Sequence, residues 1–145
     1  MERLKKEHII EHMIQPLFVF SDWAFFLLRI VLGIIFIYHG FPKLKNLKAT
    51  RDSFVGMGIK PGILWALVAG IVEFVGGIFL VFGFLTQLVA FLFVLEFIFI
   101  IIKVKKLKNF SSFEFDFLIL VSFLVLMTVG GGRFALDQLF GLFLY

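Results

Sequence analysis

The sequence has 145 residues, of which 61% are hydrophobic and only 17% charged, and phenylalanine alone accounts for 23. A soluble core of that size cannot bury so much apolar surface, so the composition excludes a conventional soluble enzyme and a disordered chain. There is no cysteine, which excludes a disulfide scaffold and a thiol redox centre. The formal net charge of +4 fits basic loops that face anionic lipid headgroups, and we expect no nucleic-acid partner.

The first 22 residues mix acidic and basic side chains, and they predict a short interfacial N-terminal arm rather than a cleaved leader. The run from His8 to His12 matches the H-x-x-E-H pattern of zinc proteases. That pattern also needs a further acidic ligand and a substrate cleft, so we expect no metal site. Residues 23–145 are predicted to form a single transmembrane domain.

Four apolar stretches follow the arm, each close to the roughly 20 residues that cross a bilayer as a helix. They are expected at about 23–41, 61–82, 86–102 and 115–129. Pro42 is predicted to end the first helix, Pro61 to occupy the first position of the second, and Gly83 to close the second. The predicted fold class is therefore all-α: a polytopic membrane protein built as a four-transmembrane-helix bundle.

Basic residues are distributed unequally between the two sides of this bundle. The loops after the first and third stretches carry five and four of them, against four on the opposite side. The positive-inside rule then predicts a multi-pass protein of the cell membrane with both basic loops in the cytoplasm and both termini outside.

Three ionisable residues fall inside the predicted spans, namely Arg29, Glu73 and Glu96. At about 1.5 Å per residue, Arg29 and Glu73 each lie about 18 Å from the first loop, and Glu96 lies about 15 Å from the other side. We therefore expect the three to meet near the bilayer centre, with Arg29 and Glu73 as a pair and one carboxyl protonated. Both a structural ion pair and a proton- or ligand-handling site fit this pattern.

The second span has a face of small residues that includes Ala66, Gly70 and Gly77, with Gly76 on an adjoining ridge. Small residues allow helix backbones to approach closely in membranes. This face is predicted to pack against another helix, most simply the first span.

His39 and Lys43 lie where the first span meets its basic loop. Either they compensate the helix C-terminus, or they form an interfacial pocket for a polar headgroup with Glu114 or Asp116. His39 is the only histidine in or near a span, so paired axial haem ligation within one chain is excluded and no intrinsic cofactor is evident.

Three groups of residues in chain order carry a resemblance to a known family. They are Leu28-Arg29-Ile30 with Gly33, Phe36, His39-Gly40 and Lys43; Glu73-Phe74-Val75-Gly76-Gly77 with Gly83 and Thr86; and Gly130, Gly132-Arg133 and Leu136-Asp137. Together they cover about residues 27–137, and the pattern resembles the DoxX family of small four-helix membrane proteins. The sequence departs from it at Gly131, where the family often has proline, and in its longer N-terminal arm.

The resemblance implies a membrane subunit or docking partner of a quinone-linked oxidoreductase complex, because family relatives are linked to quinone reduction coupled to thiosulfate oxidation and to oxidative-stress complexes. It implies quinone as ligand and a membrane or soluble redox protein as partner. The residues leave two alternatives open: a small transporter or lipid-binding protein, which would also favour a homo-oligomer, and a structural membrane scaffold.

Overall fold

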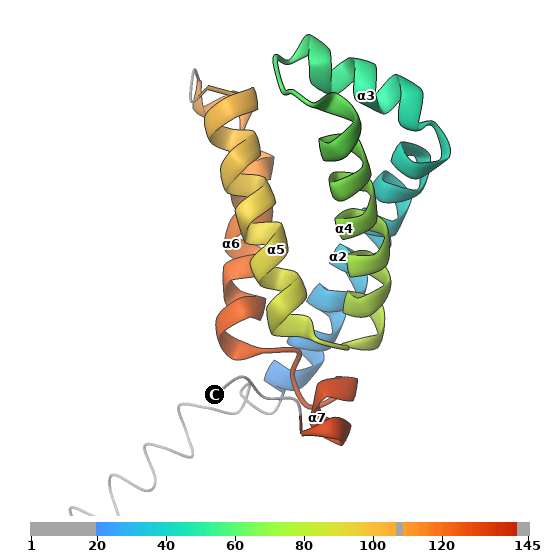
Figure 1. Ribbon diagram of the computed structural model, residues 1–145. Helices are drawn as coiled ribbons and strands as arrows, with labels where there is room; N and C mark the ends of the chain where they lie inside the picture. Colours follow the sequence, from blue (N-terminus) through green and yellow to red (C-terminus); the bar gives the residue numbers. More distant parts are fainter. Residues whose placement is uncertain (1–19, 107–108, 142–145) are drawn as a thin grey trace, which may run out of the picture.

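A computed structural model describes residues 20–106 and 109–141 of the chain. The predicted N-terminal arm, including the run from His8 to His12, falls almost entirely outside the described residues. The described residues are mostly helical and contain no strand. Figure 1 shows long helices side by side in a bundle, with short helices at both ends.

The long helices agree with the predicted apolar stretches to within a few residues. They are α2 (Ser21–Lys45), α4 (Gly62–Phe82), α5 (Thr86–Phe99), which continues into the π-helical turn η2 (Ile100–Val104), and α6 (Glu114–Val129). The short helices are α3 (Leu47–Gly56), η3 (Phe110–Ser112) and α7 (Leu136–Phe140).

Three helices of the described chain are long and apolar enough to cross a membrane: Ser21–Lys45, Gly62–Phe82 and Thr86–Val104. The fourth long helix, α6, has 16 residues. Its rise of about 1.5 Å per residue gives about 24 Å, slightly less than a hydrocarbon layer of about 30 Å. A fourth spanning helix therefore stays a prediction.

The end of the first helix differs from the prediction. Pro42 lies inside α2, which continues to Lys45. Proline removes only its own N–H from the helix ladder, and its carbonyl still accepts a hydrogen bond from the backbone N–H of Asn46 at 3.0 Å. The side chain of Asn46 then caps α3 by accepting a hydrogen bond from the N–H of Ala49 at 3.2 Å.

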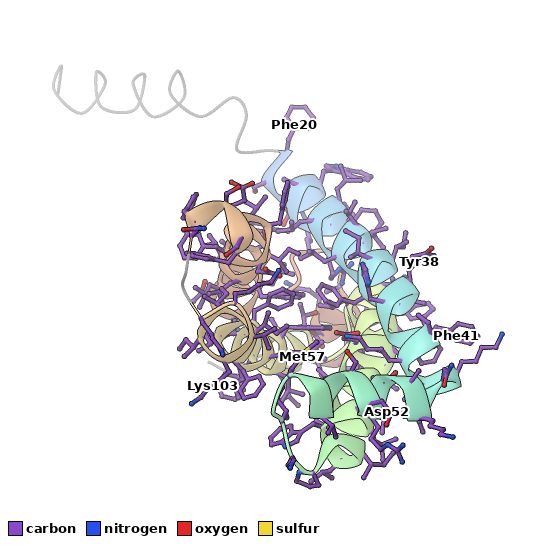
Figure 2. All side chains as sticks on the ribbon, turned by 90° about the horizontal axis from the view of Figure 1, so that it is seen from above. Phe20, Tyr38, Phe41, Asp52, Met57 and Lys103 are labelled. Atoms are coloured by element: carbon purple, nitrogen blue, oxygen red, sulfur yellow. The ribbon has the colours of Figure 1, made fainter. Side chains whose placement is uncertain are left out.

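Helix α3 was not predicted, and it lies across one end of the bundle (Figure 1). The view along the bundle from that end shows Met57, the residue after α3, near the middle of the bundle, while Tyr38 and Phe41 of α2 point away from it (Figure 2). The loop after the first long helix thus folds into a helix, α3, that covers one end of the bundle.

Helices α4 and α5 form a tight hairpin. Gly83 ends α4 in the left-handed conformation, with φ of 67° and ψ of 43°, as the sequence predicted. Pro61 precedes the first residue of α4 instead of occupying it, a shift of one position.

Aromatic rings fill the space between the α2–α4 pair and the α5–α6 pair. The ring of Phe36 lies 4.3 Å from that of Phe93 and 5.3 Å from that of Phe123, measured between centroids, and Phe93 stacks on Phe123 at 4.4 Å. Leu80 and Leu126 are also fully buried in this core. The middle of the bundle is therefore apolar, and charged side chains gather on either side of it.

Candidate functional site

An ion pair joins α2 to α4 at the end of the bundle that α3 covers. The ammonium of Lys43 donates a hydrogen bond to Oε1 of Glu73. The Glu73 side chain is 5% exposed and that of Lys43 is 32% exposed. Lys43 therefore reaches inward from the helix end to a carboxylate that is buried in the bundle, which keeps the charge of Glu73 compensated.

Glu96 of α5 completes a cluster of three ionisable groups. Its carboxyl interacts with that of Glu73 and is also close enough to Lys43 for an electrostatic interaction. One oxygen of each carboxyl, Oε2 of Glu73 and Oε2 of Glu96, is buried and has no hydrogen-bond partner among the described residues. We call Lys43, Glu73 and Glu96 the charged cluster.

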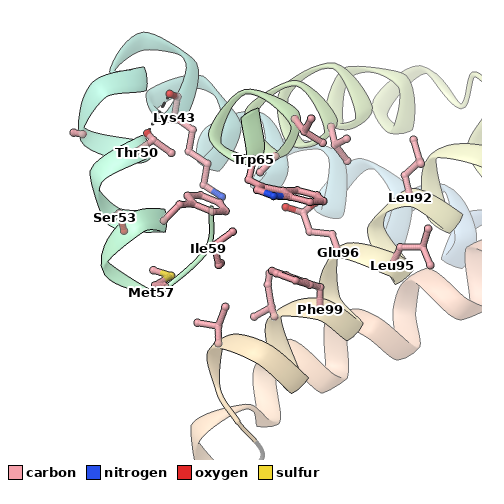
Figure 3. Close-up of a pocket in the computed structure, with 17 residues that line it drawn as sticks. Lys43, Thr50, Ser53, Met57, Ile59, Trp65, Leu92, Leu95, Glu96 and Phe99 are labelled. Carbon is pink, nitrogen blue, oxygen red and sulfur yellow. Dashed lines mark hydrogen bonds between the residues drawn. The ribbon is translucent and has the colours of Figure 1, made fainter. Parts of the chain in front are cut away.

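The charged cluster borders a cavity of about 820 Å³. The cavity lies between helices, and α3 covers one side of it (Figure 3). Its polar or aromatic lining residues include Lys43 from α2, Thr50 and Ser53 from α3, Trp65 from α4, and Glu96 and Phe99 from α5. Most of the remaining lining is aliphatic, so the cavity suits an apolar molecule with one polar end.

Lys43 and Glu96 are the two charged residues that line the cavity, and their charged ends point into it from opposite sides in Figure 3. Glu73 is not part of the lining and lies behind them. The ring of Trp65 stacks against that of Phe99 at 6.0 Å between centroids and 13° between planes. A ligand in the cavity would therefore meet one cationic and one carboxyl side chain, beside an aromatic wall.

Two local features shape the cavity. The hydroxyl of Thr50 donates hydrogen bonds to the backbone oxygens of Lys43, at 3.2 Å, and Asn46, at 3.0 Å, which ties α3 to the end of α2. On the opposite wall, η2 widens the last turn of the third long helix, and its residues Ile100 and Val104 line the cavity. Single π-helical turns of this kind occur frequently at functional sites.

Arg29 lies in a second polar centre, on the other side of the aromatic core. Its side chain is fully buried, and Nη2 donates a hydrogen bond to the backbone oxygen of Phe134 at 3.1 Å. The guanidinium lies against Gly83, where a Cβ would overlap it, and Asp137 is the acidic side chain that attracts it. Arg29 thus connects α2 to the α4–α5 turn and to the segment before α7.

The structure does not bring Arg29 and Glu73 together, and the expected pair is wrong. The prediction treated Phe41 and Pro61 as level, but the backbone of Gly40 lies against that of Phe74. Glu73 is therefore level with Gly40, about 16 Å along α2 from Arg29. The error arose because α2 is longer than expected and because the first turn of α4 packs against α3, where Gly62 meets Arg51.

The other predicted site residues also lie in different places instead of forming one site. Lys43 is in the charged cluster, whereas His39 is exposed on α2, beside Tyr38, and does not line the cavity. Asp116 lies 3.7 Å from the ammonium of Lys105. Among the described residues no hydrogen bond or ion pair joins His39 or Lys43 to Glu114 or Asp116, and the headgroup pocket stays a prediction.

The glycines of α4 make close helix contacts. A Cβ on Gly77 would lie 2.8 Å from the backbone oxygen of Gly33 and from the backbone nitrogen of Ile37, and one on Gly70 would lie 2.7 Å from the side chain of Leu44. Gly76 faces α5, where a Cβ would lie 3.2 Å from Phe93. These contacts hold α4 close to α2, which places Glu73 within reach of Lys43.

Sequence reasoning missed the cavity and its α3 cover. One signal was present: Asn46 is a favoured helix-capping residue, and Gly56 ends the ten residues that follow it. Helix α3 is too polar to stand out in a search for apolar stretches.

Comparisons with known proteins identify the family of the chain. The DoxX family model matches residues 24–106. The Bacillus subtilis (strain 168) protein named "Putative oxidoreductase CatD" is 36% identical over 112 residues, which cover 77% of this chain and 82% of that protein. "Inner membrane protein YqjF" of Escherichia coli (strain K12) is 31% identical over 130 residues, covering 82% of this chain and 93% of that protein. No solved structure gives a significant match. Because the family match spans more than half of the sequence and both relatives align over most of their length, this multi-pass membrane protein belongs to the DoxX family.

Proposed function

We propose that the cavity binds a quinone and that the protein acts as the membrane subunit, or membrane docking partner, of a quinone-linked oxidoreductase complex. The observation that carries this proposal is the cavity of about 820 Å³, whose mainly apolar lining ends in Lys43 and Glu96. A quinone has a ring with carbonyl acceptors and an apolar tail, and such a lining matches both parts. The relative from Bacillus subtilis, whose name includes "oxidoreductase", supports a redox role.

The electrons would come from a partner protein. The sequence has no cysteine, and no group of three or more His, Asp or Glu residues in the described ranges could hold a metal ion. The role proposed for this chain is to bind the quinone, orient its ring and supply hydrogen-bonding groups, in the bilayer and next to the partner.

The aromatic core favours binding over transport. The two polar centres are separated by the rings of Phe36, Phe93 and Phe123, which are buried and closely packed. A polar substrate that crossed the bundle would have to displace these rings. The cavity thus suits a ligand that enters and leaves on the side of the charged cluster.

Tryptophan fluorescence offers a direct test, because the chain has two tryptophans and only Trp65 lines the cavity. Trp23 lies near the other polar centre, 4.7 Å from the ring of Phe134. In the Trp23→Phe variant, Trp65 is the only reporter; in the Trp65→Phe variant, Trp23 is. Both variants are titrated with decylubiquinone and a short-chain menaquinone analogue in lipid nanodiscs.

We expect saturable quenching of Trp65 and weak, non-saturating quenching of Trp23. Equal, non-saturating quenching of both would mean that quinone only partitions into the lipid, and the proposal would be wrong. Dodecanoate and phosphatidylglycerol serve as competitors. Displacement of quinone by either at a similar concentration would instead assign the cavity to a lipid, the alternative function.

A further inference from the structure

The charged cluster has an unequal number of acids and bases. Lys43 supplies one positive charge, while Glu73 and Glu96 supply two negative charges if both are ionised. A net charge among buried groups of a membrane-spanning bundle is energetically costly. One bound proton makes the cluster neutral.

The contacts indicate which carboxyl holds the proton. Lys43 donates a hydrogen bond to Oε1 of Glu73, so the cation of the cluster is engaged by that carboxyl group. Among the described residues no ion pair joins Glu96 to the ammonium, and its carboxyl lies beside that of Glu73. Two carboxyl groups in contact need a proton between them, so the proton belongs on Glu96.

Glu96 also lines the cavity, whereas Glu73 does not. The charged groups that face Glu96 are Glu73 from α4 and Lys43 from α2. The cavity lining from α3 and η2 contributes hydroxyls and apolar side chains, such as those of Thr50 and Ile100. A protonated Glu96 would therefore be the one acidic hydrogen-bond donor that a ligand meets.

Building on the proposed function, we propose that Glu96 is a ligand-binding residue whose protonated carboxyl donates a hydrogen bond to a carbonyl oxygen of the quinone. Glu73 is then a positioning residue. Glu73 accepts the hydrogen bond of the Lys43 ammonium. Because the cation is engaged there, Glu96 stays neutral instead of carrying a second negative charge. Without a ligand, the O–H of Glu96 is directed to Glu73. With a ligand, it turns to the carbonyl.

The test uses the Trp23→Phe background, in which Trp65 reports binding, and measures decylubiquinone affinity from about pH 5 to about pH 9. With Glu96 intact, affinity is expected to fall as pH rises, because deprotonation removes the donor and leaves a second negative charge. Glu96→Gln keeps an N–H donor but cannot titrate, so it is expected to bind with an affinity that does not depend on pH. Glu96→Leu, which has no donor, is expected to bind about tenfold more weakly at low pH.

The positioning role of Glu73 has its own variant. In Glu73→Gln, Glu96 is left as the only carboxyl beside Lys43, so it is expected to ionise, and the affinity at low pH is expected to be about tenfold lower than in the parent. Adding Glu96→Gln to that variant restores a donor and is expected to recover most of the affinity. A merely structural role of Glu73 would give no such recovery.

The two proposals fail in different ways. If Trp65 shows no saturable quinone binding in the parent, the proposed function is wrong. If the parent binds quinone but its affinity is independent of pH, or if Glu96→Leu binds as tightly as the parent, the proton on Glu96 is contradicted while the quinone site stands. Far-ultraviolet circular dichroism of each variant shows that the fold is retained.

Discussion

Lys43, in the last turn of α2, donates a hydrogen bond to Glu73, halfway along α4, across 30 positions of the chain. This pair connects the two most closely packed long helices at the wall of the cavity. Because Glu73 is buried and Lys43 is partly exposed, the carboxylate depends on the lysine more than the lysine depends on the carboxylate.

We expect the two residues to be strongly coupled in stability. Lys43→Met leaves a buried carboxylate without its cation and is expected to lower the free energy of unfolding by about 3 kcal/mol. The Lys43→Met/Glu73→Gln double variant is expected to recover at least about 1 kcal/mol of that loss. Unfolding in mixed micelles with increasing denaturing detergent measures all four members of the cycle. Losses that simply add would contradict the pair.

The loss of stability caused by each glycine substitution is expected to depend on the atoms that the new methyl group would contact. Gly77→Ala is expected to be the most damaging, by about 1–3 kcal/mol, because the Cβ would press on the backbone of α2. Gly70→Ala meets the side chain of Leu44, which can rotate, and is expected to cost less. Gly56→Ala, whose Cβ would have nothing within 4 Å, is the matched control.

The same unfolding measurement compares the three glycine variants. The control is expected to unfold like the parent or slightly later, since alanine favours helix by up to about 1 kcal/mol. Equal stability of Gly77→Ala and Gly56→Ala would mean that α2 and α4 do not approach as closely as described.

Asp137 is expected to stabilise the α4–α5 turn. Its carboxylate accepts hydrogen bonds from the backbone N–H groups of Leu85, at 2.6 Å, and Thr86, at 2.8 Å, at the start of α5. Asp137→Ala removes this cap, which is worth about 1–2 kcal/mol, and also leaves Arg29 without its facing acid. The exposed neighbour Gln138 provides the control variant Gln138→Ala. A Tm for Asp137→Ala equal to that of the control would contradict the capping role.

The orientation of the chain and the fourth span can be tested together. Ser111 in η3 precedes α6, Gln138 in α7 follows it, and both are exposed. In this cysteine-free chain, we expect a membrane-impermeant maleimide to label Gln138→Cys in intact cells and Ser111→Cys only after permeabilisation. The reverse pattern would invert the orientation, and labelling of both in intact cells would mean that α6 does not cross.

The apolar stretches were readable from the sequence because a spanning helix needs a long run of apolar residues, and Gly83 was readable as a stop because glycine tolerates the left-handed conformation. The register between helices, meaning which residues of α2 and α4 lie at the same level, could not be read from the sequence. It depends on where loops fold, and α3, capped by Asn46, shifted α4 by about three turns relative to α2.

The cluster partners were therefore assigned incorrectly even though each charged residue was identified. Lys43 was placed at the interface by its position in the sequence, but its long side chain reaches back to Glu73 inside the bundle. The distance from a helix end to a side-chain tip cannot be read from residue spacing alone, and neither can a cavity, which is defined by what the surrounding side chains leave unfilled.

The most direct test of the central claim is the quinone content of the protein purified from its native membrane in a mild detergent. Ala69 lines the cavity, whereas Ala24 is exposed on α2 and does not line it, so Ala69→Phe and Ala24→Phe add the same volume inside and outside the proposed site. Extracted quinone is quantified by chromatography and mass spectrometry. We predict close to one quinone per chain in the parent and in Ala24→Phe, and a large loss in Ala69→Phe. Equal quinone content in both variants, or none in the parent, would contradict the assignment of the cavity to quinone.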